Sequence, residues 1–336
     1  MSTSERFHNR RGIAIIMVLW VVLVLSLLIT GFAFTMHVET QVASYARKAL
    51  KAEMLARSGI EVARMQLILD AQSPTNTGYD ALNQDWATNE LLYVDHELGD
   101  GTYNVKVTDE ESKIPVNRVT DVQLKRLFSL LGVDPFDGDV MTDSILDWID
   151  ADDLTRLNGA ESDYYQSLSP AYRAKNAALD RVEELLLIRG VTPELYQGVP
   201  ATDKDPARPG LGELLTTTTS GSINVNTASA IVLQMMLGLD DVQVQAVLSR
   251  RDGPDGIPGT DDDVPFRNPD EFFAIAGNMD PLAKQAAQGF VTVTSSFFTV
   301  KSTGEVGGVK RTILATLFRN GVNVQIVMWR EVREGV

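Results

Sequence analysis

Residues 13–34 form an uninterrupted apolar run, IAIIMVLWVVLVLSLLITGFAF, that contains no charged side chain. An α-helix rises about 1.5 Å per residue, so this run would form a helix roughly 33 Å long, and the hydrocarbon core of a bilayer is about 30 Å thick. The run is also longer than the apolar region of a secretory signal, and no small-residue cleavage site follows it. It therefore predicts one membrane-spanning helix.

The helical pattern continues past the apolar run, because no proline occurs between it and Pro74. We therefore predict one N-terminal helix over residues 13–72, with a transmembrane part at 13–34 and an amphipathic part at 35–72. Small and apolar residues recur along the second part at spacings of three and four, as on one face of a helix. We expect this stripe to face a partner, with sister helices as its docking site: Val42, Tyr45, Ala49, Ala52, Leu55, Ala56, Ile60, Ala63 and Leu67.

The charge of the chain is distributed unevenly. The formal net charge is −15, yet residues 1–60 hold seven Lys or Arg against three acidic residues, so residues 61–336 carry −19. An anionic body argues against nucleic-acid binding. Arg6, Arg10 and Arg11 precede the apolar run, whereas the first charge after it is Glu39. The positive-inside tendency therefore predicts a cytoplasmic N-terminus and a soluble body outside the inner membrane, in the periplasm. Cysteine is absent, which excludes disulfides.

The junction between the basic leader and the apolar run resembles a type IV prepilin signal. In such signals a prepilin peptidase cuts after a glycine, which would be Gly12 here and would make Ile13 the first mature residue. An ordinary signal anchor with a basic flank is the alternative. Pilins usually carry glutamate at the fifth mature position, where it neutralises a neighbouring N-terminal amine, but this chain has Met17 there. Because an unpaired charge inside an apolar bundle is costly, such a subunit belongs at the end of a fibre.

The segments 73–110 and 288–336 predict one antiparallel sheet. Residues 102–109, TYNVKVTD, alternate apolar and polar side chains, and Asn320-Gly321 between two β-rich runs is a strong hairpin signal. Residues 111–287 between these segments are largely helical in character. The sequence therefore predicts an α+β fold, in which a long N-terminal helix packs on an antiparallel sheet that carries a large all-helical insertion.

The insertion contains an internal repeat, which we assign to residues 113–200 and 221–287. KIPVN at residue 113 matches SINVN at residue 222, so that Asn117 aligns with Asn226, and EELLLIRG aligns with DEFFAIAG, so that Glu184 aligns with Glu271. Each copy reads as helix, hairpin, helix and a further short helix. This pattern resembles the helix-hairpin-helix modules of SAM-like, DNA-binding folds, which makes a membrane-anchored DNA-binding protein the alternative function. Asp240 and Asp241 in the second hairpin would repel phosphate, however, which favours a structural role.

Residues 134–163 form the densest acidic cluster, with nine Asp and one Glu against Arg156 alone. Carboxylates grouped around turn residues, without His or Cys, suit a hard cation such as Ca²⁺, which binds six to eight oxygens. The alternative is a solvated loop whose aspartates cap helices. Six carboxylates are the candidate ligands of this first calcium site: Asp147, Asp150, Asp152, Asp153, Glu161 and Asp163.

A second acidic stretch, RDGPDGIPGTDDDVPF, resembles calcium-binding loops of the DG-x-x-GT-x-DD kind and occupies the equivalent place in the second copy. A plain Gly/Pro/Asp surface loop explains it equally well. Its candidate ligands are Asp255, Asp261, Asp262 and Asp263. Elsewhere the chain has no GxSxG, HExxH or phosphate-binding glycine loop, so we expect no enzyme and no catalytic residues.

Several of these features occur together in one family. Gly12-Ile13, Met17, SILDWIDADD with NGAESDYY, YRAKN before VEELLLIRGV, and SINVNTAS resemble the minor pseudopilin K family of type II secretion systems. The resemblance implies a pseudopilin fold with a large helical insertion, and a position at the tip of the pseudopilus, where the protein caps or initiates assembly for export across the outer membrane. It also implies a hetero-oligomer with minor pseudopilins I and J and the major pseudopilin, processing by prepilin peptidase, and calcium in the loop after Trp148. Ser162 departs from the family, which often has a further Asp there.

Overall fold

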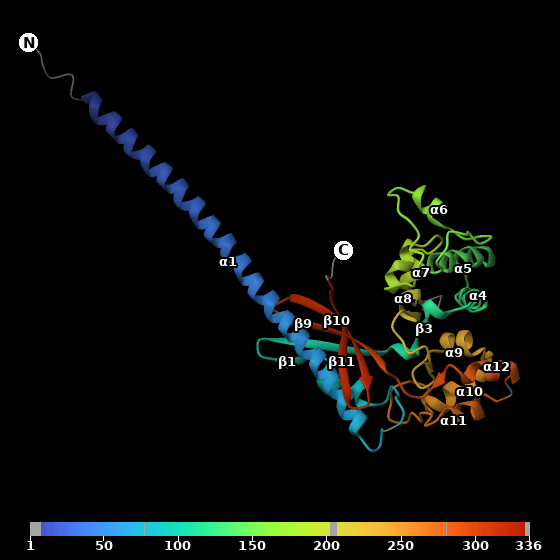
Figure 1. Cartoon of the computed structure of the whole chain (residues 1–336). Coiled ribbons are helices and arrows are strands. Elements are labelled where there is room, and N and C mark those ends of the chain that lie inside the picture. Colours follow the sequence, from blue (N-terminus) through green and yellow to red (C-terminus); the bar gives the residue numbers. More distant parts are fainter. Residues whose placement is uncertain (1–7, 77, 202–206, 278, 280, 333–336) are drawn as a thin grey trace, which may run out of the picture.

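The computed structural model describes residues 8–76, 78–201, 207–277, 279 and 281–332. It shows a long N-terminal helix, a five-stranded antiparallel sheet and a helical insertion beside the sheet (Figure 1). The predicted α+β fold is therefore confirmed. Among the described residues one helix is long and apolar enough to cross a membrane, within Ile13–Gln72.

Helix α1 (His8–Gln72) is continuous over 65 residues and begins inside the segment that the sequence assigns to the leader. Its N-terminal half projects alone from the rest of the molecule (Figure 1). The threonine hydroxyls in and just after the apolar run do not interrupt the helix, because Thr30 and Thr35 each donate to the backbone carbonyl four residues earlier. Thr30 Oγ1, for instance, lies 2.8 Å from the carbonyl of Ser26. Such bonds leave few polar groups exposed to lipid.

The sheet has the strand order β1-β2-β9-β10-β11, and every neighbouring pair is antiparallel. Its strands are β1 (His96–Leu98), β2 (Gly101–Asp109), β9 (Phe297–Val306), β10 (Val309–Asn320) and β11 (Asn323–Val332). Two short helices, α2 (Asp85–Thr88) and α3 (Glu90–Tyr93), precede β1. The hairpin between β10 and β11 turns at Asn320-Gly321, where Gly321 has φ +57°. Burial alternates along β9, as on a sheet with one covered face.

The C-terminal half of α1 covers that face of the sheet. Ala52, Leu55, Ala56, Ile60, Ala63 and Leu67 are buried in one hydrophobic cluster with residues of β2, β9 and β10. The approach is close, since a Cβ on Gly304 would lie 2.0 Å from the carbonyl oxygen of Ala52. The expectation that this stripe docks on sister helices is therefore corrected for residues 52–67, which dock on the chain's own sheet. Val42 and Tyr45, by contrast, remain exposed.

The insertion lies between β2 and β9. Its elements are η1 (Glu110–Ser112), β3 (Ile114–Pro115), η2 (Val116–Arg118), α4 (Asp121–Leu130), α5 (Pro135–Ile149), α6 (Ser162–Gln166), η3 (Val182–Leu187), α7 (Pro193–Gln197), β4 (Gly198–Val199), β5 (Arg208–Pro209), α8 (Leu211–Leu214), β6 (Leu215–Thr216), β7 (Ile223–Asn224), α9 (Ala230–Leu237), α10 (Asp241–Arg251), α11 (Pro269–Ala276), α12 (Pro281–Gln288) and β8 (Val291–Thr292).

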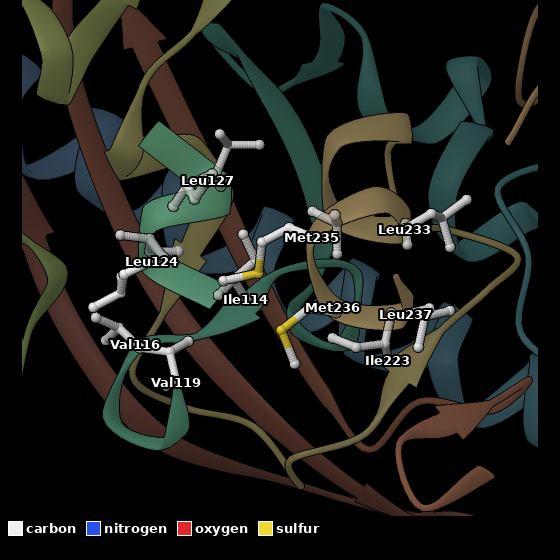
Figure 2. Packing of buried hydrophobic residues seen from close by; sticks show 14 of the residues in the cluster. Ile114, Val116, Val119, Leu124, Leu127, Ile223, Leu233, Met235, Met236 and Leu237 are labelled. Carbon is white, nitrogen blue, oxygen red and sulfur yellow. The ribbon is translucent and has the colours of Figure 1, made fainter. Parts of the chain in front are cut away.

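One hydrophobic core joins the two halves of the insertion through α4 and α9. Met235 and Met236 extend from α9 toward Leu124 and Leu127 of α4 (Figure 2). Each half also opens with a two-residue strand that pairs in parallel with a strand that follows that half in the chain, β3 with β6 and β7 with β8. The two halves thus have the same strand pairing, and they contact each other through equivalent helices, α4 and α9.

The aligned asparagines make the same bonds in both halves. Asn117 donates to the carbonyl of Leu179 and accepts from its amide, at 2.9 and 2.8 Å. Asn226 does the same with Phe266, also at 2.9 and 2.8 Å. Each asparagine therefore fastens the segment that leads into the following short helix, which begins with Glu184 or Glu271 in its first turn.

Candidate functional site

The first acidic loop joins α5 to α6 and is folded back against α5. Asn158 donates from both its amide nitrogen and its side chain to Asp143 Oδ2, at 3.0 and 3.1 Å. Gly159 lies so close to the helix that a Cβ there would be 2.0 Å from Asp147 Oδ2. Trp148 packs edge-on against Tyr165 of α6, with ring centroids 5.1 Å apart. These contacts bring the two ends of the loop together over the C-terminal turns of α5.

Asp147 on α5 is fully buried beneath this loop. Its carboxylate accepts from the backbone amide of Arg156 at 3.2 Å, and the Arg156 guanidinium lies 3.3 Å from Asp147 Oδ1 and 3.6 Å from Asp150 Oδ2. Arg156 is the one cationic side chain between residues 134 and 163. It therefore acts as a counter-ion for both aspartates.

Glu161 returns from the loop toward the same place and has no such partner. Its side chain is 3% exposed, and neither carboxylate oxygen has a hydrogen-bond partner among the described residues; the same is true of Asp150 Oδ1. Burial, followed by the charges of Asp147, Asp150 and Asp153, raises the pKa of Glu161 to about 7. Burial likewise raises the pKa of Asp147 to about 6. The cluster thus holds more negative charge than Arg156 compensates.

The structure brings Asp147, Asp150 and Asp153 within electrostatic reach of Glu161. Two further candidates are placed differently, because Asp152 caps its own loop by accepting from Leu154 N at 2.9 Å and Asp163 is exposed in the first turn of α6.

The residues that sequence reasoning missed are Asp143, Arg156 as a counter-ion, and Asn176. Asn176 donates to Asp153 Oδ1 at 3.0 Å, and its own Oδ1 is buried without a partner. Its φ of +48° belongs to the left-handed region, which asparagine tolerates better than most residues. The YRAKN motif was the available signal for it.

The side-chain oxygens of this loop are the type of ligand that a hard cation binds. No group of three or more His, Cys, Asp or Glu side chains among the described residues already has the arrangement that holds an ion. The carboxylate oxygens of Glu161 and Asp150 that lack partners are, however, buried beside further carboxylates. Buried polar groups are normally hydrogen-bonded, so oxygens in this condition point to a missing positive partner. Oxygen donors without nitrogen or sulfur are the ligands that Ca²⁺ prefers.

The second acidic loop, between α10 and α11, satisfies its carboxylates internally. Asp255 Oδ1 accepts from Ile257 N at 2.8 Å, Asp263 Oδ2 from Gly259 N at 2.7 Å, and Asp262 Oδ1 from Thr260 Oγ1 at 2.7 Å. Asp261 is exposed. Hydrogen bonds within the loop therefore engage Asp255, Asp262 and Asp263, and a second calcium site here stays a prediction.

The second hairpin of the repeat, between α9 and α10, has its polar groups engaged within the protein. Gly238 adopts φ +72°, and Arg126 of α4 donates to the carbonyl of Leu239 at 2.9 Å. Asp240 caps α10 by accepting from Gln243 N at 2.8 Å. The Asp240 carboxylate at this turn would repel phosphate, so the DNA-binding alternative is not supported.

The processing junction lies at the start of α1. Gly12 and Ile13 are both helical, whereas residues 1–7 of the predicted leader lie outside the described residues. Ile13 and Met17 are exposed on the helix, as is the whole apolar run through Phe34.

The chain is similar to proteins of one family along nearly its whole length. Two family models described as type II secretion system protein K match residues 101–200 and 223–294. The type II secretion system protein K of Pseudomonas aeruginosa is 25% identical over 98% of this chain and 94% of its own length, and that of Aeromonas hydrophila is 24% identical over 98% of both. One chain from the crystal structure of the GspK-GspI-GspJ complex of enterotoxigenic Escherichia coli superimposes with a TM-score of 0.68, 19% identity, and coverage of 88% of this chain and 100% of that one.

Proposed function

Since the chain belongs to the type II secretion system protein K family, in which it is a minor pseudopilin, we propose that it caps the tip of the pseudopilus and initiates its assembly for protein export. The family and the apolar N-terminal helix indicate a membrane-anchored protein. In this proposal α1 spans the inner membrane with its N-terminus in the cytoplasm, the body is periplasmic, and prepilin peptidase cuts after Gly12. The role is assembly rather than catalysis.

The proposed position at the tip of the pseudopilus rests mainly on Met17. A subunit in the middle of an apolar bundle must neutralise the N-terminal amine of a neighbour, and a methionine at the fifth mature position supplies no charge for this. The insertion also fits a position at the end of the fibre. It adds a large group of helices beside the sheet (Figure 1), and a stack of small, uniform subunits has no space for such a group between its members. The partners follow from the chain with the same fold, which was solved in complex with GspI and GspJ. We assign the corresponding minor pseudopilins I and J to this chain, with the major pseudopilin below them.

Co-expression of the full chain with pseudopilins I and J tests this function. After detergent extraction, we expect both partners to co-purify with the chain, and intact-mass analysis should give a chain that begins at Ile13. In the absence of prepilin peptidase the mass should be that of the uncut protein. A chain that stays uncut beside an active peptidase, or that retains neither partner, would contradict the proposal.

We further propose that the first acidic loop holds Ca²⁺. Asp147, Asp150 and Glu161 would supply the main ligands, because their carboxylates converge and Glu161 has no other partner. Asp153 lies near enough to contribute, while Asp152 and Asp163 would need to turn inward from their present positions. When bound, the cation would supply positive charge that offsets the repulsion among the carboxylates. Arg156 supplies part of that charge itself, since it contacts Asp147 and Asp150.

Chelation should therefore destabilise the insertion. A ligand present at 100 times its Kd stabilises a fold by about 2.7 kcal/mol, so we expect a chelator to lower the melting temperature of the full chain in detergent by about 5–10 °C. Glu161→Gln should abolish most of this response. Because it also removes a buried, unpaired charge, the chelated variant should melt at or above the chelated wild type. Fluorescence of Trp148, which packs beside the loop, reports the transition.

Glu194→Gln is the matched control for this measurement, because Glu194 is an exposed glutamate of α7 in the same half of the insertion. It should keep the full response to the chelator. Equal melting temperatures of the wild type with and without chelator would remove the calcium proposal, and an undiminished response of Glu161→Gln would remove its ligand assignment.

A further inference from the structure

The side chain of Arg156 lies among the carboxylates that the proposed calcium site would use. Its Nε lies 3.3 Å from Asp147 Oδ1, and its Nη2 lies 3.6 Å from Asp150 Oδ2. Calcium binds carboxylate oxygens at about 2.3–2.6 Å. An ion that shared these two oxygens with the guanidinium would lie close to it, and the two positive charges would repel each other. The guanidinium and the ion are therefore alternative partners of the same oxygens.

The contacts of Arg156 are loose compared with those of a buried arginine in the same protein. Both distances exceed the 2.7–2.9 Å or so of a charge-assisted hydrogen bond, and the Arg156 side chain is 44% exposed. Arg251 lies 2.5 Å from Asp252, and these two side chains are 6% and 8% exposed. Arg251 also donates to the carbonyls of Val225 and Ala228. Arg251 is thus fixed in place, whereas the Arg156 side chain can leave its partners.

The backbone of the loop is held independently of the Arg156 guanidinium. The backbone amide of Arg156 donates to Asp147 Oδ2 at 3.2 Å. Two residues later, Asn158 donates to Asp143 Oδ2 from its backbone and from its side chain, at 3.0 and 3.1 Å. These bonds do not involve the guanidinium. The loop can therefore keep its path along α5 while the guanidinium rotates into the solvent that it already contacts.

Arg156 compensates the charge of the cluster only in part. Among the described residues its ion pairs are with Asp147 and Asp150 and not with Glu161. Both oxygens of Glu161, like Asp150 Oδ1, are buried without a hydrogen-bond partner. When ionised, these three carboxylates carry −3, so the group has a net charge of −2 with Arg156 and would have −1 with a divalent ion in its place. An ion that reaches all three carboxylates therefore compensates the cluster better than Arg156 does.

We propose that Arg156 competes with Ca²⁺ for Asp147 and Asp150, so that binding of the ion displaces the guanidinium into solvent and Arg156 sets the affinity of the site. This inference rests on the proposed calcium site and deepens it, because it names the residue that regulates the loading of that site. At low calcium concentration the guanidinium holds the two aspartates, and at high concentration the ion does. Part of the binding free energy is spent on breaking the two ion pairs, so the site binds calcium less tightly than its carboxylates alone would.

The substitution Arg156→Gln tests the competition, because it should change affinity and stability in opposite directions. Calcium titration of the full chain in detergent, followed by Trp148 fluorescence, should give a Kd about tenfold lower than that of the wild type, since two partly exposed ion pairs no longer have to be broken. In chelator, the variant should melt about 2–4 °C below the wild type, because the carboxylates have lost their counter-ion. At saturating calcium it should melt at or above the wild type. An arginine with a purely structural role would, on removal, weaken binding and stability together.

Two further variants control for charge. Arg156→Lys keeps the positive charge at the site, so its Kd should remain closer to that of the wild type than to that of Arg156→Gln. Arg173→Gln removes an exposed arginine from the same half of the insertion and should leave the Kd unchanged. It separates the loss of a contact from the change in net charge.

The outcomes distinguish the competition from the calcium site itself. If the wild type binds calcium and Arg156→Gln binds it equally or less tightly, the competition is wrong and the calcium site stands. The competition is also wrong if Arg173→Gln tightens binding as much as Arg156→Gln does. If calcium changes neither the Trp148 fluorescence nor the melting temperature of the wild type, the calcium site and this inference both fail.

Discussion

The substitution Asn226→Ala should lower the free energy of unfolding of the insertion by about 2–5 kcal/mol. Asn226 is buried and bonds both the amide and the carbonyl of Phe266, which is itself fully buried. Alanine would leave both backbone groups without a partner, and each such group costs about 1–3 kcal/mol. In a domain the size of the insertion, this loss of stability corresponds to a fall in melting temperature of roughly 10 °C. Thermal unfolding of the full chain in detergent measures it.

The equivalent substitution in the other half calibrates this result. Asn117 makes the same two bonds to Leu179 but is only partly buried, so water can replace them in part and Asn117→Ala should cost about 1–2 kcal/mol. Asn83→Ala is a control, since that side chain reaches a single carbonyl at 3.5 Å and should change little. Equal effects of Asn226→Ala and Asn83→Ala would show that the paired bonds do not hold the unit together.

The parts of the fold that were predictable are those with a long, regular pattern. The apolar run and the three- and four-residue spacing predicted α1, and Asn320-Gly321 predicted the β10–β11 hairpin. The stripe on α1 showed that one face is buried but not against what. Its partner from Ala52 to Leu67 is the chain's own sheet, because the sheet is apolar on the side where the strands reach the helix. Periodicity reports burial and carries no information on which surface supplies it.

The candidate site was predictable in composition but not in geometry. The acidic residues around Asp147 indicated an oxygen-rich loop, yet the sequence did not show which carboxylates Arg156 and Asn176 would contact. Arg156 contacts Asp147 only because the loop folds back on α5, and Asn176 reaches Asp153 from 23 residues away. Glu161, one of six equal candidates in the sequence, is distinguished only by its burial without a partner. Such distinctions depend on tertiary packing.

A second group of carboxylates joins the sheet to the insertion and was not anticipated from the sequence. Asp109, at the end of β2, accepts from Thr227 and Ser295 through one oxygen at 2.5 and 2.6 Å. Thr227 lies in the insertion and Ser295 lies just before β9. The bonds therefore hold together the two points, after β2 and before β9, at which the insertion joins the sheet. Arg319 of β10 is the cation of this junction and pairs with Asp70 at 3.2 Å and with Asp80.

Raising the pH from 5 to 8 should therefore destabilise the protein, and Asp109→Asn should remove part of this dependence. Burial, then the charge of Glu111, raises the pKa of Asp109 to about 8 from an ordinary value of 3.8. A raised pKa means that the folded state holds a proton that the unfolded state has released, so the stabilisation is complete below about pH 4 and is lost as the pH rises toward 8. The loss is at most about 1.4 kcal/mol per pH unit for one proton. Burial also raises the pKa values of Asp70, Asp80 and Glu111, which act with the same sign.

The Asp109→Asn side chain remains neutral throughout this range. The free energy of unfolding of this variant should therefore fall less steeply with pH than that of the wild type, and the difference in slope should be at most that of one bound proton. Urea unfolding of the full chain at pH 5, 6, 7 and 8, followed by the fluorescence of the buried Trp86 and Trp148, measures the two slopes. A chelator in every sample keeps the acidic loop in one state, so its contribution cancels in the comparison. Asp137→Asn, on the exposed surface of α5, should retain the wild-type slope. Parallel slopes for Asp109→Asn and the wild type would mean that Asp109 is ionised in the folded protein, and that the hydroxyls of Thr227 and Ser295 stabilise the charge enough to outweigh burial.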